Sequence, residues 1–321
     1  MASPAEKSKF VAHDRSGDRS CRVTLRLAVA LVLLQLPLGC SGMSAFTQKQ
    51  AQESKTLATK AKSAEQAGRH QYAEQLLMSA IQKNPEDVDL RLQLAKSYLA
   101  RGETQFAVAA LQKASEVQPE NQKIYELWAQ VLITNGQFDD ALIPLNLGLR
   151  QKPDQVELLM MKGHCDEQSE RYQQAFDSYQ RVVHIDPNHC SARVRMAQIQ
   201  INWGKPNLAA PLLRAAIQDP NLDDDTRTEA WWLLGIVYGQ EGRWQDAVTA
   251  LRTSAKTKEK LDAEEGYRLA YAEFQAGEIG DAMDRATEIL KSQPDHQPTR
   301  AMLKILRLDE PSSDLSADGV V

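Results

Sequence analysis

The chain has 321 residues, of which 42% are hydrophobic and 25% charged, an ordinary composition with enough apolar material for a buried core. Its formal net charge is −5, and because nucleic-acid phosphates attract clustered Lys and Arg, the acidic balance argues against a nucleic acid as partner. Four cysteines in a chain of this length do not form a disulfide-dependent scaffold, which is typical of much smaller domains.

Residues 1–40 have the layout of an export segment. Four arginines between positions 15 and 26 precede an apolar run at residues 27–38. This run is shorter than the roughly 20 apolar residues that span a bilayer core, and it contains Gln35 and Pro37. A positive flank, a short apolar core and small residues after it are typical of a secretory signal.

The apolar run ends in Leu36-Pro-Leu-Gly-Cys40, which resembles the lipobox of bacterial lipoproteins. In that family the cysteine is lipidated and becomes the mature N-terminus, so Cys40 is the lipidation candidate. The match is partial, because Pro37 stands where leucine is usual. The resemblance implies a periplasm-facing lipoprotein of the cell envelope, and Ser41, which is not acidic, favours the outer membrane. The alternatives are a secreted protein, an inner-membrane anchor, and a chain that stays in the cytosol.

The body of the chain repeats itself with a period of 34 residues, with an insertion of four residues before Ala247 and of one residue before Ala282. Glycines and small residues recur at fixed distances before a series of alanines, and prolines recur at the same spacing. The alanines and prolines are Ala73, Ala107, Ala141, Ala175, Ala209, Ala247 and Ala282, and Pro85, Pro119, Pro153 and Pro187. Periods of this length are typical of solenoids built from stacked repeats.

Each recurring residue fits a helix–turn–helix unit. Apolar residues at helical spacing, as in Trp231, Leu234 and Tyr238, mark one face of a first helix. A small residue such as Gly235 lets a second helix approach closely, and Gly242 permits the turn between the two. Proline then closes the second helix, because it cannot continue one.

The pattern Trp231-x-x-Leu234-Gly235-x-x-Tyr238, followed by Gly242, Ala247 and Leu251, resembles the tetratricopeptide repeat. The resemblance implies an all-α fold, a right-handed superhelical solenoid of about seven hairpins. The expected array covers 54–296, with repeats near 54–87, 88–121, 122–155, 156–189, 190–223, 228–261 and 263–296. The fourth repeat departs most from the pattern, because Glu170 replaces the turn glycine and Asp166 replaces an aromatic residue.

The array is flanked on both sides. Residues 41–53 are expected to form a polar tether or an early helix. Residues 297–308 contain Met302, Leu303 and Leu306, which predict a capping helix over the last repeat. Residues 309–321 are rich in Ser, Asp and Gly and predict a disordered tail.

Motifs of catalysis are missing from the sequence. No glycine-rich phosphate loop, nucleophile elbow or His-Glu-x-x-His motif occurs, so we expect neither an enzyme nor a cofactor. Cys165 and Cys190 have histidine neighbours and are zinc-ligand types, but their expected separation of about 13 Å along the helix axes favours incidental placement over a metal site or a disulfide. The segment Asp219–Asp225 resembles the start of a calcium loop but lacks its glycine and its glutamate. A linker followed by a capping box at Thr226–Glu229 is the favoured interpretation.

In the tetratricopeptide family, the second, fifth, ninth and twelfth residues of each first helix line a concave groove. The resemblance therefore assigns to a partner-binding face Leu92, Lys96, Glu126, Gln130, Met160, His164, Val194, Gln198, Trp232, Ile236, Tyr267, Tyr271 and Phe274. The C-terminal part of this stripe is aromatic, and aromatic residues are frequent interface anchors; the alternative is that they fill space between helices. The Lys/Asn clamp of Hsp70/Hsp90-binding members is absent, so that class of partner is not expected.

These features predict a non-catalytic scaffold or adaptor of the bacterial cell envelope, holding a polypeptide segment in its groove. The layout is similar to that of tetratricopeptide lipoproteins that assist type IV pilus assembly or outer-membrane biogenesis. The alternatives are a periplasmic chaperone-like or regulatory module that works with a separate enzyme chain, and a self-associating structural protein. The expected partner is a protein or peptide, and the membrane is reached through an N-terminal lipid or anchor.

Overall fold

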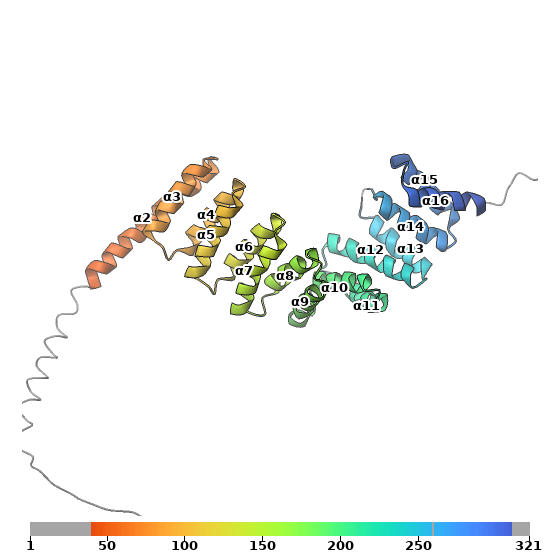
Figure 1. The fold of residues 1–321 in the computed structure, drawn as a ribbon, viewed down its shortest axis with the longest axis horizontal. Coiled ribbons are helices and arrows are strands. Elements are labelled where there is room, and N and C mark those ends of the chain that lie inside the picture. Colours follow the sequence, from red (N-terminus) through yellow and green to blue (C-terminus); the bar gives the residue numbers. More distant parts are fainter. Residues whose placement is uncertain (1–39, 259, 310–321) are drawn as a thin grey trace, which may run out of the picture. The chain divides into compact units, whose positions relative to one another are not determined.

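The computed structural model describes residues 40–258 and 260–309, which form helices joined by turns (Figure 1). The all-α prediction is confirmed, since these residues contain fifteen helices and no strand. None of the described helices is both long enough and apolar enough to cross a bilayer. The helices are α2 (Cys40–Gln66), α3 (His70–Lys83), α4 (Val88–Ala100), α5 (Thr104–Val117), α6 (Gln122–Thr134), α7 (Phe138–Gln151), α8 (Val156–Gln168), α9 (Tyr172–Ile185), α10 (Cys190–Asn202), α11 (Pro206–Ile217), α12 (Asp224–Gln240), α13 (Trp244–Ala255), α14 (Ala263–Gln275), α15 (Ile279–Ser292) and α16 (Gln297–Asp309).

The helices follow the expected repeats in pairs, from α2 and α3 to α14 and α15, with α16 after the last pair. The expectation of about seven hairpins is confirmed. Residues 41–53 belong to α2, so they continue the first helix of the array. Of the export segment 1–40 only Cys40 is described, and of the tail 309–321 only Asp309; the remainder of both lies outside the described residues.

The chain divides into two compact units, residues 1–101 and residues 102–321. In the first unit, α2 packs on α3 and α3 packs on α4. Its core combines alanines at the helix crossings with Leu77 and Leu94. Arg101 Nη1 donates to the buried Glu74 Oε2 at 2.7 Å, which ties the end of α4 to α3.

In the second unit, every helix from α5 to α15 packs against the next helix along the chain. Several first helices also contact the first helix of the following hairpin, as α10 does with α12. This nearest-neighbour packing is typical of a solenoid, in which no hairpin can bury its apolar face alone.

Small residues occupy the points where two helices of a hairpin cross. Ala129 and Ala197 are fully buried. A Cβ added at Gly163 would lie 2.4 Å from Tyr179 Cε1, and one added at Gly235 would lie 2.6 Å from Leu251 Cγ. Both distances are far below van der Waals contact, so the recurring small residue is required by the close approach of the helices.

The turn between the helices of a hairpin places one residue in the left-handed region. Gly136 has φ 73° there, and Glu170 of the fourth repeat adopts the same conformation with φ 59°. The hydrogen bonds also match, because Arg171 N donates to Asp166 O at 2.7 Å as Gln137 N donates to Leu132 O at 2.8 Å. The fourth repeat therefore keeps the turn without its glycine, at the cost of an unfavourable φ for a residue with a side chain.

Polar contacts surround this unusual turn. Asp166, which stands where an aromatic residue was expected, is 1% exposed. Its carboxylate accepts hydrogen bonds from Lys162 Nζ at 2.6 Å and Arg171 Nε at 3.0 Å. Arg171 Nη1 also donates to Asp139 Oδ1 of α7 at 2.7 Å, which lowers the pKa of Asp139. A charged network thus replaces aromatic packing in this repeat.

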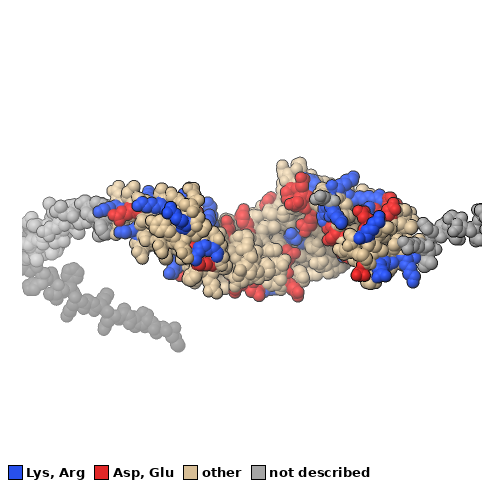
Figure 2. All heavy atoms as spheres, turned by 90° about the horizontal axis from the view of Figure 1, so that it is seen from above, with Lys and Arg blue, Asp and Glu red and all other residues tan. Residues whose placement is uncertain are grey.

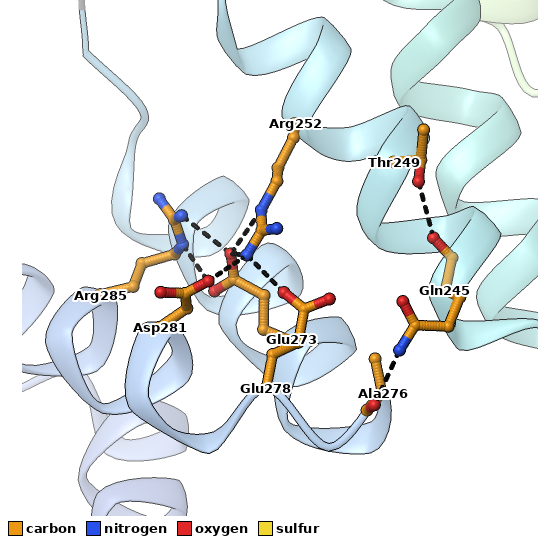
Figure 3. A network of polar contacts seen from close by, with 8 residues as sticks. All are labelled: Gln245, Thr249, Arg252, Glu273, Ala276, Glu278, Asp281 and Arg285. Atoms are coloured by element: carbon orange, nitrogen blue, oxygen red, sulfur yellow. Dashed lines mark hydrogen bonds and ion pairs between the residues drawn. The ribbon is translucent and has the colours of Figure 1, made fainter.

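A second charged network joins α13, α14 and α15 (Figure 3). Its centre is the fully buried Glu273 of α14. The Glu273 carboxylate accepts from Arg252 Nη2 at 2.8 Å and from Arg285 Nε at 2.9 Å. Burial alone would lower the pKa of Arg252, but its contacts with Glu273 and Glu278 raise it. Arg252 Nη2 also lies 2.7 Å from Asp281 Oδ2.

The last helix, α16, packs on α15 and α14. Met302, Leu303 and Leu306 are buried there against alanines of the last hairpin. α16 therefore lies where the capping helix was expected, over the otherwise exposed apolar face of the array.

Candidate functional site

The stripe of residues expected to face a partner lies along the first helices. Most of its members are half-buried, and three are exposed. The half-buried members are Leu92, Glu126, Met160, His164, Gln198, Trp232, Ile236, Tyr267 and Phe274, and the exposed members are Lys96, Gln130 and Tyr271. In α6, burial and the neighbouring Glu157 raise the pKa of Glu126. Half-buried side chains on one face can both pack and contact a ligand.

Val194 is the exception. It is 1% exposed and belongs to a core cluster formed by α10, α11 and α12. The expectation that Val194 contacts a partner is therefore wrong. The reason is local packing, because α10 lies directly against α12 at this level and covers the fifth position of its repeat.

An apolar cleft of about 400 Å³ lies among α12, α13 and α14. We call it the apolar cleft. Its lining includes three of the expected stripe residues, Ile236, Tyr267 and Tyr271. Trp244 and Leu251 of α13 complete the apolar wall, and Glu264 and Arg268 of α14 lie at its edge.

The aromatic rings of this cleft are held in place by one another. Trp244 and Tyr271 pack edge to face with ring centroids 5.8 Å apart, and Tyr267 lies 6.2 Å from Tyr271. Burial, followed by Tyr271 and Glu264, raises the pKa of Tyr267, so its hydroxyl stays neutral. Gly239 lies close against the Trp244 ring, because a Cβ there would lie 3.3 Å from Trp244 Cζ3.

A second cleft of about 720 Å³ begins at the N-terminal end of α12. Its lining contains four carboxylates and one ammonium group, so we call it the acidic cleft. The lining residues are Asp224, Asp225, Thr228, Glu229, Trp232, Thr257, Lys258 and Glu265. The single cation, Lys258, is paired with Glu265 and lies 5.9 Å from the centre of the Trp232 ring.

Neighbouring residues of α12 and α14 line the two clefts. Trp232 lines the acidic cleft and Ile236, one helical turn later, lines the apolar cleft. In α14, Glu265 lines the acidic cleft and Glu264 lines the apolar cleft. Figure 2 shows Asp and Glu side chains interspersed with Lys and Arg on the visible face of the unit formed by residues 102–321. A ligand lying along α12 would meet an acidic region and an apolar region in succession.

The two cysteines and the acidic segment Asp219–Asp225, which the sequence suggested as possible metal ligands, have local structural roles. Cys165 and Cys190 are free, buried thiols. Asp219 accepts from Asn221 N at 2.8 Å, and Asp223 accepts from Thr226 N at 2.8 Å. Asp223 is thus the N-cap of α12, and the expected capping box at Thr226 is wrong because the helix begins earlier. Within residues 40–258 and 260–309, no three His, Cys, Asp or Glu side chains are grouped to hold a metal ion.

Two parts of the site were not expected from the sequence. Trp244 lies on a second helix, whereas the family pattern points only to first helices. Asp225 and Lys258 line one cleft because the start of α12 lies against the turn after α13, where Thr228 Oγ1 and Thr257 Oγ1 are 2.8 Å apart. The inserted acidic residues between the fifth and sixth repeats were the available signal, since insertions in repeat proteins often lie on a binding face.

Family models match most of the array. Models described as tetratricopeptide repeat match residues 64–127, 98–165 and 156–189. A model described as the C-terminal ARM domain of tetratricopeptide repeat protein 21 matches residues 182–305. No curated protein matches the chain at a significant level.

Solved structures share the fold at low sequence identity. A tetratricopeptide repeat protein from Parabacteroides merdae ATCC 43184 has a TM-score of 0.53 and 18% identity, covering 80% of this chain and 99% of its own. Pseudomonas aeruginosa pilF has a TM-score of 0.57 and 16% identity, covering 68% and 97%. YrrB, described as a tetratricopeptide repeat protein with an unusual peptide-binding site, has a TM-score of 0.52 and 19% identity, covering 61% and 98%. This chain belongs to the tetratricopeptide repeat family, whose fold is typically a non-catalytic scaffold for protein interactions.

Proposed function

We propose that this protein is a non-catalytic adaptor that holds a polypeptide segment against α12, α13 and α14. The observation that supports the proposal is the apolar cleft, where Ile236, Tyr267 and Tyr271 border about 400 Å³ of open space. This volume lies within the range of roughly 300–1,000 Å³ that ligand sites occupy. Clustered aromatic side chains beside such a space are the usual anchors of an interface.

A linear segment fits this cleft better than a folded domain does. The cleft is lined by three consecutive helices, α12, α13 and α14, and has a volume of about 400 Å³, which suits a few side chains of an extended segment. YrrB, which shares the fold, is described with a peptide-binding site, so the fold has a precedent for this type of ligand.

Site-specific photo-crosslinking in cells tests the proposal. A benzophenone amino acid at Tyr271, which is 39% exposed in the cleft, should form a discrete adduct with a polypeptide partner. The matched control is Leu208 of α11, which is 49% exposed and lines neither cleft. The adduct should disappear when Trp232 and Ile236 are replaced by alanine, provided that thermal unfolding is unchanged. Equal crosslinking from both positions, or none from Tyr271, contradicts the proposal.

We further propose that the adaptor is a periplasm-facing lipoprotein of the bacterial envelope, lipidated at Cys40. The support is the basic and apolar sequence of residues 15–40, which ends in the lipobox-like segment. Cells grown with a palmitate analogue should label the wild-type protein and not the Cys40→Ser variant. Absence of label, or label that survives the substitution, refutes lipidation.

A further inference from the structure

We propose that the bound segment is basic, with a large apolar side chain in the apolar cleft and a lysine or arginine four residues away at the acidic cleft. This inference rests on the proposed function and adds the chemistry of the partner. Two observations carry it: the charge of the acidic cleft and its distance from the apolar cleft.

The charge of the acidic cleft favours a cationic ligand. Glu229 is paired with Arg195 at 3.3 Å, and Glu265 is paired with Lys258. Asp224 and Asp225 are both exposed, and neither forms an ion pair with any described residue. A ligand ammonium or guanidinium group would find two carboxylates there that no cation of the described chain neutralises.

Helix capping alone does not account for these two carboxylates. Acidic residues are favourable in the first turn of a helix, and both lie in the first turn of α12. However, Asp223 already accepts the Thr226 N–H and is the N-cap. Asp224 and Asp225 form part of the cleft wall together with Trp232, whose ring can contact the apolar stem of a long basic side chain.

The distance between the clefts sets the spacing of the two ligand side chains. Asp225 and Ile236 are separated by eleven residues of α12, a rise of about 16 Å. An extended polypeptide advances roughly 3.3 Å per residue, and its side chains alternate between two faces. Side chains four residues apart therefore point the same way and lie about 13 Å apart. A lysine or arginine side chain is long enough to cover the remaining distance to the two carboxylates.

Selection from a random nine-residue peptide library, displayed on phage and panned against the full chain, tests the inference. Enriched sequences should carry Lys or Arg four residues from a large apolar residue. The best peptide should bind the Asp224→Asn/Asp225→Asn variant at least ten-fold more weakly than the wild type, and its binding should weaken as salt rises. The charge-matched control is Glu116→Gln/Glu120→Gln, two exposed positions outside both clefts, which should bind like the wild type.

The outcomes separate this inference from the proposed function. Enrichment of neutral or acidic peptides that still require Trp232 and Ile236 overturns the basic specificity and leaves the adaptor proposal standing. Equal affinity of the wild type and the double-asparagine variant, with thermal unfolding unchanged, overturns it as well. No enrichment beyond that obtained with the Trp232→Ala/Ile236→Ala variant overturns both proposals.

Discussion

The buried carboxylate of Glu273 offers a direct test of how α13, α14 and α15 are held together. The perturbation is Glu273→Gln, which keeps the size of the side chain but removes its charge. Glu273 is fully buried and accepts four hydrogen bonds, two each from Arg252 and Arg285, at 2.8–3.1 Å. In the variant, the amide nitrogen would face guanidinium donors, so at least one of these contacts becomes repulsive.

The expected loss of stability is about 3 kcal/mol. Removing one partner of a buried ion pair typically costs about 3–5 kcal/mol. We expect a cost at the lower end of this range, because Arg252 and Arg285 keep 36% and 26% of their side-chain surface exposed. Arg252 also keeps its contacts with Glu278 and Asp281 in the variant. For a unit of this size, the loss corresponds to a decrease in Tm of roughly 6–12 °C.

Urea denaturation and hydrogen exchange followed by mass spectrometry provide the assay. Exchange should accelerate in α13, α14 and α15 and stay unchanged in α6 and α7, because repeats contact only their neighbours. The control is Glu53→Gln, which removes an exposed ion pair with Lys83 and should cost less than about 0.5 kcal/mol. If Glu273→Gln is as mild as the control, or if exchange rises equally along the whole array, the reasoning about this network is refuted.

Three further predictions concern the repeats. Glu170→Gly should raise stability by about 0.5–1 kcal/mol in urea denaturation, because φ 59° is unfavourable for a side chain, whereas Gly136→Ala should lower it by a similar amount. Gly163→Ala should cost about 2 kcal/mol in the same assay, because the new Cβ would lie 2.4 Å from the buried Tyr179 ring. Burial raises the pKa of Cys165 to about 11, whereas the thiol of the unfolded chain ionises at lower pH. The free energy of unfolding should therefore be highest below about pH 9 and fall as the pH rises toward 11. This decline should be smaller in Cys165→Ala.

Each of these three predictions has a result that would contradict it. A Glu170→Gly variant less stable than wild type would show that the side chain contributes more than its backbone conformation costs. An unchanged stability in Gly163→Ala would mean that the helices can separate at little cost. A pH profile identical in wild type and Cys165→Ala would show that this thiol does not titrate differently on unfolding.

The sequence predicted the hairpins well because each recurring residue has a local physical reason. Gly136 and its equivalents mark turns that need a left-handed residue, and Gly163 and Gly235 mark crossings with no room for a side chain. These constraints act within one hairpin, so they can be read from spacing alone. The start of α12 was misplaced, because the choice between Asp223 and Thr226 as N-cap depends on where the inserted linker runs.

The candidate site was only partly predictable. Ile236, Tyr267 and Tyr271 were expected from the family pattern, and all three line the apolar cleft. Trp244 and the acidic cleft depend on contacts between different elements, which a spacing rule for first helices does not include. The expectation that Val194 contacts a partner was wrong for the same reason, because its burial depends on how closely α10 approaches α12.

The length of α12 has a consequence for stoichiometry. α12 has 17 residues, whereas the first helices α4, α6, α8, α10 and α14 each have 13. The added residues amount to about one extra turn, and they carry Asp224 and Asp225. α2, with 27 residues, is also longer, but its first turn holds no acidic residue, so α12 is the one first helix among those described that combines added length with an acidic first turn. We therefore expect one binding site of this kind. A titration should therefore reach its end point at one peptide per protein molecule.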